Sequence, residues 1–427
     1  MPCGAVCFII ERIANRSGGA ERIVIELGNW LASQGIPVRI VSYERSKGKP
    51  FYPLAFGVTH CNLRRPDNTR GWIRRGLDRM RSTIHGAPLF IEPFGKLFWH
   101  SKHGGFERAL ERDLFIHRPE VAVSFLPPAI VALGRVKVPP GLRRIASVHN
   151  VPELDLASTA RWDPNPLDVR RRMEALIAHD EITVLLDEFR NWFPSDLRVK
   201  VRVIPNLVSP ASEVKIHCEK LVVSVGRLAE VKRHEVLVDA WAQVIDSFPD
   251  WRLQIYGVGP MYQSLTARIA AMGLQASISL EGHVHGIDSV YKRAAILAHP
   301  AAYEGWGLAV TEALAHGVPA IGFEDCPGVN QLIRHEENGL LASSQGKREE
   351  TLATALSRLM SDEPLRRRLA ARGPASVAAF APDRVHSQWL KALYPKQETS
   401  QKVTLCNKAI PEDGIYISPY DVKGVKI

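Results

Sequence analysis

The stretch HPAAYEGWGLAVTEALAHGVPAIGFEDCPGVN, residues 299–330, predicts a strand end, a glycine-rich turn, a helix, a second strand and a second turn. We expect the helix to run from Leu308 to His316, because Gly317 and Pro319 follow it and are typical of helix ends. Glu304 lies before this helix, and Glu312 is expected about two turns inside it. Two carboxylates placed around one helix start could contact two parts of an elongated ligand, or could be solvated surface residues.

The glycines of this stretch favour the interpretation that Glu304 and Glu312 contact a ligand over the interpretation that they are solvated surface residues. Gly305 and Gly307 flank Trp306 and leave little side-chain bulk before Leu308. A ligand could therefore approach the free N–H groups of the helix N-terminus, which favour oxygen anions and hydroxyls.

Composition limits the class of protein. A chain of 427 residues with 45% hydrophobic residues predicts two domains plus appendages. No run of 18 apolar residues is present, and MPCGAVCFIIER resembles a first strand more than a signal peptide, so we expect a cytoplasmic chain. Six cysteines without a CxxC pair argue against a zinc site and a disulfide framework. A net charge of +10 predicts an anionic partner, namely a nucleotide, a nucleic acid or a membrane surface.

The first part of the chain reads as an α/β domain. A strand over residues 5–10 and a helix that opens at Gly18 and Gly19 come first, and these glycines could hold a phosphate through backbone amides. Paired glycines are common in α/β turns, and neither GxGxxG nor GxxxxGK occurs. A later strand, residues 144–148, precedes His149, which is either a ligand contact at a strand end or a structural histidine.

A basic and aromatic segment interrupts this first domain. Seven arginines lie within residues 64–81, and an aromatic stretch that includes Trp99 follows. Such a segment suits an anionic lipid surface, and it could equally be an insertion folded over the core. Nucleic acid is a weaker alternative, because the aromatics are separate from the arginines and no binding motif is present.

A second α/β series follows a linker at residues 204–206. Arg227 comes directly after the strand at residues 221–226, and Lys232 comes five residues later. These cations could clamp a diphosphate without a metal, although surface cations are common. In the loop after residues 278–281, His283 and Val284 could present backbone groups to a base. We discount a metal site at His283 and His285, because no acidic partners stand nearby in the sequence.

Together these motifs resemble the retaining glycosyltransferases of family 4, over about residues 3–395. EGWGLAVTE matches the E-x7-E signature of that family, and SGGAER, VHN, VIPN and VGRLAEVK match further motifs in the same order. The resemblance implies the α/β GT-B fold, in which two Rossmann-like parallel-sheet domains face each other across a cleft. It gives an acceptor domain at 1–206 with an insertion at 64–103, a donor domain at 207–382, a helix at 383–395 that crosses back to the first domain, and a tail at 396–427.

The resemblance also implies roles for single residues. Arg227 and Lys232 would hold the donor diphosphate, Gly19 would offer its amide to the β-phosphate, and Glu312 would bind the ribose. Glu304 would face the transferred sugar, which His149 would contact. Backbone groups of residues 326–330, with Gly328 and Val329 among them, would contact sugar hydroxyls. The CPGVN motif is typical of a branch that builds bacterial surface polysaccharides, but Gln331 stands where that branch usually has Glu. The complete expected donor site comprises Gly18, Gly19, Arg227, Lys232, His283, Val284, Gly305, Trp306, Gly307, Leu308, Glu312, Gly328 and Val329.

The expected activity is retaining transfer of a sugar from a nucleotide sugar, by family a UDP-sugar, with no cofactor. The sequence contains no D-x-D, which agrees with a metal-independent enzyme. The expected acceptor is a glycan on a polyprenyl diphosphate at the cytoplasmic face of the membrane, bound peripherally through residues 64–103, and no nucleic acid is expected. Alternatives are a soluble acceptor, or a non-catalytic protein that binds nucleotide sugars.

Overall fold

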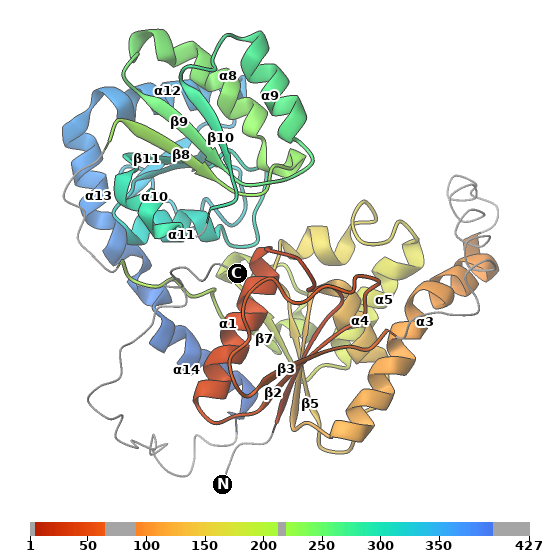
Figure 1. The fold of residues 1–427 in the computed structure, drawn as a ribbon. Coiled ribbons are helices and arrows are strands. Elements are labelled where there is room, and N and C mark those ends of the chain that lie inside the picture. Colours follow the sequence, from red (N-terminus) through yellow and green to blue (C-terminus); the bar gives the residue numbers. More distant parts are fainter. Residues whose placement is uncertain (1–4, 65–90, 212–218, 285, 396–427) are drawn as a thin grey trace, which may run out of the picture. The chain divides into compact units, whose positions relative to one another are not determined.

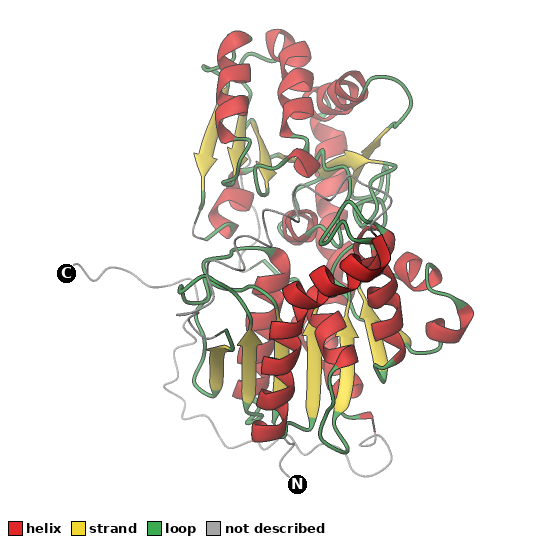
Figure 2. Cartoon of the chain, turned by 90° about the vertical axis from the view of Figure 1, so that its right-hand side faces the viewer, coloured by secondary structure: helices red, strands yellow, loops and turns green. Residues whose placement is uncertain are grey.

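The structure is a computed structural model that describes residues 5–64, 91–211, 219–284 and 286–395. The chain divides into two compact units, Met1–Asn206 and Leu207–Ile427 (Figure 1). Each unit is built on one parallel sheet with helices against it (Figure 2). Arg74, Arg75, His285 and the tail after residue 395 lie outside the described residues.

The first unit holds a seven-stranded parallel sheet in the order β3-β2-β1-β4-β5-β6-β7. Its strands are β1 (Val6–Ile10), β2 (Val38–Ser42), β3 (Val58–Asn62), β4 (Val121–Phe125), β5 (Arg143–Ser147), β6 (Glu181–Val184) and β7 (Val201–Val203). Its helices are α1 (Gly19–Ser33), α3 (Ile91–His117), α4 (Leu126–Arg135), η2 (Glu153–Ala157, a π-helix), α5 (Pro166–Ile177), α6 (Asp187–Asn191) and α7 (Ser195–Arg198).

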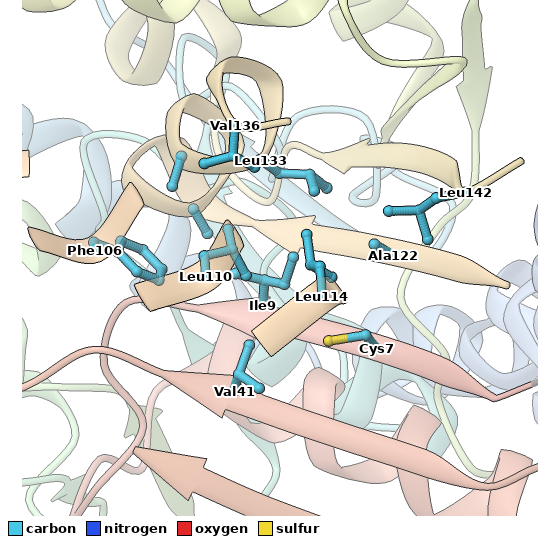
Figure 3. Packing of buried hydrophobic residues seen from close by; sticks show 12 residues of the cluster. Cys7, Ile9, Val41, Phe106, Leu110, Leu114, Ala122, Leu133, Val136 and Leu142 are labelled. Atoms are coloured by element: carbon cyan, nitrogen blue, oxygen red, sulfur yellow. The ribbon is translucent and has the colours of Figure 1, made fainter. Parts of the chain in front are cut away.

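The central strands of this sheet are apolar throughout because both of their faces are covered. Every residue of β1 is buried. Cys7 and Ile9 point to one face and pack with apolar residues of α3 and α4 (Figure 3). Phe8 points to the other face, where it meets Phe125 edge-on with ring centroids 5.3 Å apart. α1 lies against that opposite face (Figure 1), and its buried stripe repeats at helical spacing.

The second unit holds a six-stranded parallel sheet in the order β10-β9-β8-β11-β12-β13. Its strands are β8 (Leu221–Val225), β9 (Arg252–Tyr256), β10 (Ile278–Gly282), β11 (Ile296–Ala298), β12 (Ala320–Phe323) and β13 (Gly339–Ala342). Its helices are η3 (Glu230–Lys232), α8 (His234–Val244), η4 (Ile245–Ser247), α9 (Tyr262–Ala271), α10 (Asp288–Arg293), α11 (Leu308–Ala315), α12 (Arg348–Ser361), α13 (Glu363–Val377), η5 (Ala378–Phe380) and α14 (Pro382–Leu393).

Each sheet has a point at which its strand order reverses. In the first sheet β2 and β3 lie on one side of β1, and the chain then returns to place β4 on the other side of β1. In the second sheet β9 and β10 lie on one side of β8, and β11 lies on the other side. In open α/β sheets, ligands bind beyond the carboxyl ends of the strands at such points. The two Rossmann-like sheets confirm the predicted GT-B architecture; the crossing of α14 to the first domain stays a prediction. Within the described residues, no helix is both long and apolar enough to cross a membrane.

Candidate active site

The switch point of the second sheet carries the two predicted cations. Arg227 follows β8 and is exposed, and its side chain has no hydrogen-bond or ion-pair partner among the described residues. Lys232 ends the short helix η3, and its side chain lies against Gly226 at the strand end. The loop after β9 approaches the same turn so closely that a Cβ at Gly257 would lie 1.9 Å from the carbonyl oxygen of Gly226. Glycine at position 257 therefore sets the shape of the turn that displays Arg227.

Lys232 forms an ion pair with Glu304, and His299 completes the group. The Lys232 ammonium contacts Oε1 of Glu304, and Nε2 of His299 lies 2.8 Å from the same oxygen. Burial alone would raise the pKa of Glu304, but the charge of Lys232 and the contact with His299 outweigh it and lower the pKa to about 2. Glu304 is therefore an ionised hydrogen-bond acceptor at neutral pH. A carboxylate with so low a pKa is poorly suited to act as a general acid or base.

The two predicted turns pack on each other through their backbones. The amide of Glu304 donates a 2.9 Å hydrogen bond to the carbonyl of Pro327. Gly328 has φ +85°, and a Cβ there would lie 2.3 Å from the carbonyl oxygen of Glu304. Val329 is buried beside Gly307, which is the N-cap of α11 with φ +81°. The residues from Gly305 to Leu308 and the turn at 326–330 thus form one glycine-dependent surface.

Two details of this stretch differ from the prediction. The indole of Trp306 is buried against Phe380, with ring centroids 4.7 Å apart, so only its backbone is placed for a ligand contact. α11 begins at Leu308 as predicted, but Glu312 is only four residues further along, so it lies little more than one turn inside the helix and the expected two turns were wrong. The hydroxyl of the buried Tyr291 donates to Oε2 of Glu312 at 3.4 Å. Glu312 is partly exposed beside the α11 N-terminus, as a ribose contact would require.

His283 and Val284 follow β10 at the carboxyl edge of the same sheet. Gly282 ends that strand with φ +71°, a left-handed conformation that turns the chain away from the sheet. His283 is exposed and Val284 is partly exposed. Their place at the strand end is compatible with the predicted backbone contact to a base.

The remaining predicted site residues belong to the first unit. His149 follows β5 and is buried, and its Nε2 lies 2.9 Å from the hydroxyl of Ser147. Burial lowers the pKa of His149 to about 4, so its imidazole is neutral at neutral pH. Gly18 caps α1, and Gly19 is its first residue. A Cβ at Gly18 would lie 2.2 Å from a carboxylate oxygen of Glu21, which pairs with Arg16 at 2.8 Å.

Sequence reasoning missed two buried histidines beside the Lys232–Glu304 pair. His299 follows β11, one of the two strands at the switch point, so the strand-end argument applied to His149 would also have found it. His234 is buried at the start of α8, and its pKa is lowered to about 3 by burial and by the charges of Lys232 and His299. No sequence signal distinguishes His234 from an ordinary core histidine.

The proposed membrane segment requires a correction at Trp99. The side chain of Trp99 is 2% exposed, and its Nε1 donates to Asp168 at 2.8 Å, so it belongs to the core and cannot insert into a lipid surface. Leu97 of the same helix is 60% exposed. Residues 65–90, which carry most of the arginines, lie outside the described residues.

The second unit matches a known family over most of its length. Residues 209–376 match the model described as "Glycosyl transferases group 1". The second unit is a group 1 glycosyl transferase domain. Its switch point, with Arg227, Lys232, His299, Glu304 and Glu312, lies within the matched residues.

Three relatives of this chain are bacterial proteins whose names refer to exopolysaccharides or glycans. An exopolysaccharide phosphotransferase of Streptomyces coelicolor is 31% identical over 50% of this chain and 23% of its own length. The amylovoran biosynthesis glycosyltransferase AmsD of Erwinia amylovora is 24% identical over 90% of this chain and 97% of its own. A Campylobacter jejuni enzyme that adds N-acetylgalactosamine to an undecaprenol-diphosphate glycan is 23% identical over 91% and 98%.

The lengths of these relatives differ from that of the present chain. The chain spans 23% of the Streptomyces relative and 52% of an uncharacterized glycosyltransferase of Haemophilus influenzae. Among solved structures, sucrose-phosphate synthase from Thermosynechococcus elongatus has a TM-score of 0.69 at 21% identity, covering 92% of this chain and 98% of its own. TarM of S. aureus, solved with UDP and other ligands, has a TM-score of 0.69 at 11% identity, covering 92% and 100%. These likenesses show the fold.

Proposed function

We propose that this protein transfers a sugar from a nucleotide-sugar donor to a glycan acceptor in polysaccharide biosynthesis. One observation carries the proposal: Arg227, whose side chain has no partner among the described residues, and the Lys232–Glu304–His299 group both lie at the switch point of the second sheet, with Glu312 one turn into α11. A nucleoside diphosphate sugar needs cations for its diphosphate and acceptors for its hydroxyls, and this arrangement supplies both.

The charges suggest how the donor would be gripped. Within the described part of the chain no carboxylate pairs with Arg227, so its guanidinium is available to the diphosphate at once. Lys232 would share its charge between Glu304 and the diphosphate as negative charge develops on the leaving group. Glu304 would accept hydrogen bonds from hydroxyls of the sugar, and Glu312 from those of the ribose. The cleaved bond joins the anomeric carbon to the diphosphate oxygen, and the new bond joins that carbon to the acceptor oxygen.

The finer features are also proposals. The low pKa values of Glu304 and His149 leave neither group poised to take a proton at neutral pH. This supports retention by front-face attack, in which the leaving phosphate takes the proton of the acceptor hydroxyl. We propose a UDP-sugar as donor without a metal requirement. We propose as acceptor a polyprenyl-diphosphate glycan at the cytoplasmic face of the membrane, in line with the Campylobacter relative.

A hydrolysis screen tests the proposed function. UDP-GlcNAc, UDP-GalNAc, UDP-Glc, UDP-Gal and GDP-Man would be incubated with the full chain, with and without EDTA. We expect release of nucleoside diphosphate from at least one donor, unaffected by EDTA. Glu304→Ala and Arg227→Ala should abolish most of this release. Arg367→Ala is the matched control, because Arg367 is an arginine of α13 whose side chain is 80% exposed and pairs with Glu363 of the same helix.

The screen has three informative negative results. Release from no donor would refute the enzyme and favour a nucleotide-sugar binding protein. Parental release by both site variants would remove the residue assignment. Inhibition by EDTA would overturn the metal-independent mechanism.

A further inference from the structure

His149 lies over a row of side chains that crosses three neighbouring strands of the first sheet. Phe125 of β4 is paired in register with Ser147 of β5, and Ser147 is paired in register with Thr183 of β6. The amide of Val148 donates to the carbonyl of Thr183 at 2.9 Å, so the strand pairing continues past the end of β5. Because side chains two residues apart on a strand project to the same face, His149 projects to the face of Ser147.

This row contacts the imidazole of His149 through one aromatic ring and two hydroxyl groups. The ring of Phe125 lies 5.3 Å from that of His149, with 34° between the two planes. Nε2 of His149 lies 2.9 Å from the hydroxyl oxygen of Ser147, and the hydroxyl of Thr183 donates to that same oxygen at 2.8 Å. Phe125, Ser147 and Thr183 are all buried, so water competes little for these contacts.

The two hydroxyl groups determine which nitrogen of His149 carries the proton. The oxygen of Ser147 accepts the hydrogen of Thr183, so the hydrogen of Ser147 is left to donate to Nε2. In a neutral imidazole whose Nε2 is an acceptor, the proton is on Nδ1. With a proton on Nε2 instead, one of the two buried hydroxyl hydrogens would have no acceptor among the described residues, which costs free energy.

His179, another buried histidine of the first unit, shows how a structural histidine is satisfied. Its Nδ1 lies 2.9 Å from the carbonyl oxygen of Ala175, to which a ring nitrogen can only donate, and its Nε2 lies 3.2 Å from the hydroxyl of Ser124. Nδ1 of His149 is also buried, but it has no hydrogen-bond partner in the described part of the chain. Buried polar groups usually have a partner, and an exception such as this one calls for an explanation.

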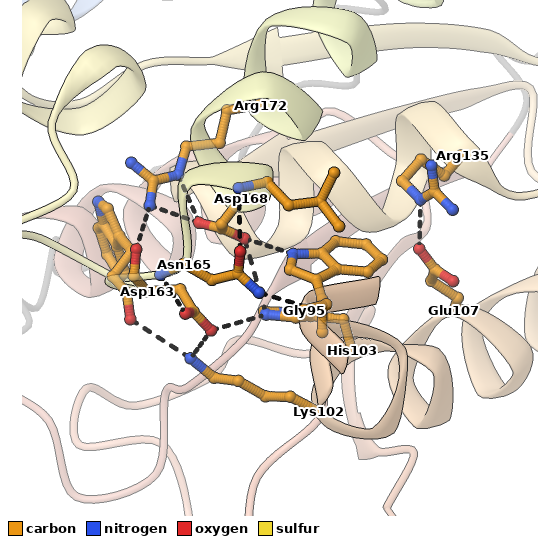
Figure 4. Close-up of polar contacts among 12 residues, drawn as sticks. Gly95, Lys102, His103, Glu107, Arg135, Asp163, Asn165, Asp168 and Arg172 are labelled. Atoms are coloured by element: carbon orange, nitrogen blue, oxygen red, sulfur yellow. Dashed lines mark hydrogen bonds and ion pairs between the residues drawn. The ribbon is translucent and has the colours of Figure 1, made fainter. Parts of the chain in front are cut away.

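The segment that follows His149 is fixed independently of the sheet. Arg172 of α5 is fully buried and pairs with Asp168 (Figure 4). Its guanidinium also donates to three main-chain carbonyls of the loop before α5, those of Asp155, Ser158 and Arg161, at 3.1, 2.8 and 3.0 Å. The loop before α5 is therefore tied to one buried charge. Because the chain is held on both sides of His149, the two hydroxyl groups only have to orient its imidazole.

We propose that Ser147 and Thr183 are positioning residues of the reaction, which hold His149 in the tautomer with its proton on Nδ1 and so reserve that N–H for a hydroxyl oxygen of the transferred sugar. In this tautomer the lone pair of Nε2 is already engaged, so His149 has no lone pair with which to take a proton from the acceptor. It therefore serves as a neutral hydrogen-bond donor. The contact with the sugar rests on the proposed function, whereas the tautomer does not.

Nitrogen-15 NMR of the full chain, labelled in its histidine side chains, tests the tautomer. The signals of His149 are identified by their loss in His149→Asn. In the parent at neutral pH we expect a protonated Nδ1 and an unprotonated Nε2. Thr183→Val removes one hydroxyl at nearly constant volume and should lower the Nδ1–H population by about half or more, because Ser147 is then free to accept from Nε2. Thr183→Ser keeps a hydroxyl and should retain the parental tautomer.

Two controls accompany these spectra. His179 is an internal reference, because a main-chain carbonyl fixes its proton on Nδ1 whatever stands at position 183, and its unchanged signals also show that each variant is folded. Thr59→Val is the matched substitution, because Thr59 is an exposed threonine of β3 in the same sheet. It should leave the signals of His149 and the hydrolysis of nucleotide sugars unchanged.

Addition of each nucleotide sugar of the hydrolysis screen tests the contact with the sugar. At least one should shift the Nδ1 signal of His149 in the parent, because a new acceptor then reaches a nitrogen that has no partner in the described part of the chain. Thr183→Val should lower kcat/KM for hydrolysis of that donor about tenfold, as expected for one misdirected hydrogen bond. Thr183→Ser should recover most of this loss.

A parent protein in which His149 carries its proton on Nε2 would overturn the proposal, and so would a tautomer that is the same in Thr183→Val and in the parent. The role in sugar binding is refuted if hydrolysis occurs but no nucleotide sugar shifts the Nδ1 signal, or if the tautomer changes in Thr183→Val without loss of hydrolysis. Absence of hydrolysis by the parent would instead refute the proposed function, and the spectra would then decide the tautomer alone.

Discussion

Replacing Lys232 with methionine should destabilise the second unit, because it leaves the carboxylate of Glu304 without its cation. The side chains of Lys232 and Glu304 are only 20% and 16% exposed, so solvent screens the pair weakly. Lys232 and His299 together lower the pKa of Glu304 from its ordinary value of 4.5 to about 2 against the effect of burial, and Lys232 is the larger of the two causes. At about 1.4 kcal/mol for each pH unit, the net shift corresponds to about 3 kcal/mol at neutral pH, which sets the order of magnitude of the expected loss. A loss of this size also agrees with breaking other buried ion pairs.

Urea unfolding of the full chain, followed by tryptophan fluorescence, measures this loss. The control is Lys220→Met, because the pair of Lys220 with Asp250 is 60% and 74% exposed and should contribute about 1 kcal/mol or less. In a second comparison, Glu304→Gln in the Lys232→Met background should recover part of the stability, because no unpaired charge is then buried.

The pH dependence gives the sign of the effect. A carboxyl group with a lowered pKa in the folded state stabilises the protein above pH 4.5, and this contribution is lost as the pH falls towards about 2. The difference between the parent and Lys232→Met should therefore be largest at neutral pH and shrink in acid. The reasoning is refuted if Lys232→Met costs no more than Lys220→Met, or if the difference does not change with pH.

Three further predictions concern other parts of the chain. Arg172→Ala should lower the free energy of unfolding of the first unit by about 3–5 kcal/mol, because it removes the cation that pairs with the buried Asp168. In the same urea titration, Arg170→Ala should change the free energy of unfolding by about 0.5 kcal/mol or less, because Arg170 is exposed. His149 should titrate near pH 4 by NMR and remain neutral above it, because burial disfavours its charged form; a midpoint near 6.5 would contradict this. Gly328→Ala should lower the free energy of unfolding by about 2–5 kcal/mol in thermal unfolding, because the new Cβ meets the carbonyl of Glu304. Gly346→Ala should lower it by about 1–2 kcal/mol, because Gly346 also has a positive φ of +88° but has open space around it. Equal losses in the two variants would argue against the close approach at Gly328.

The strands and the glycine turns could be predicted because their causes are local. Continuous apolar runs such as residues 6–10 mark strands covered on both faces, and Gly317 marks the end of α11 through its left-handed φ of +65°. The same patterns place Arg227 and His149 at strand ends, which is where the structure has them. Local sequence patterns were thus sufficient to predict the strands, the glycine turns and the residues that directly follow the strands.

The contacts between distant segments could not be predicted in this way. Lys232 and Glu304 are separated by 72 residues, and the sequence around each of them does not indicate that the two form an ion pair. Trp99 follows an aromatic run that suits a lipid surface, but its partner Asp168 lies 69 residues later and draws it into the core. Arg172 is one of three consecutive arginines, and only the fold distinguishes the fully buried one from its two neighbours.

The grip of Arg172 on the loop before α5 has a consequence for how this protein can diversify. Three of its hydrogen bonds go to main-chain carbonyls, which every amino acid possesses. These three hydrogen bonds therefore do not depend on which side chains stand at positions 158 and 161, although Ser158 accepts from the amide of Ala160 and Arg161 pairs with Asp155. Substitutions at 158 and 161 should remove those local contacts and keep the hold of Arg172 on the loop, so a library randomised at these two positions should contain many folded members.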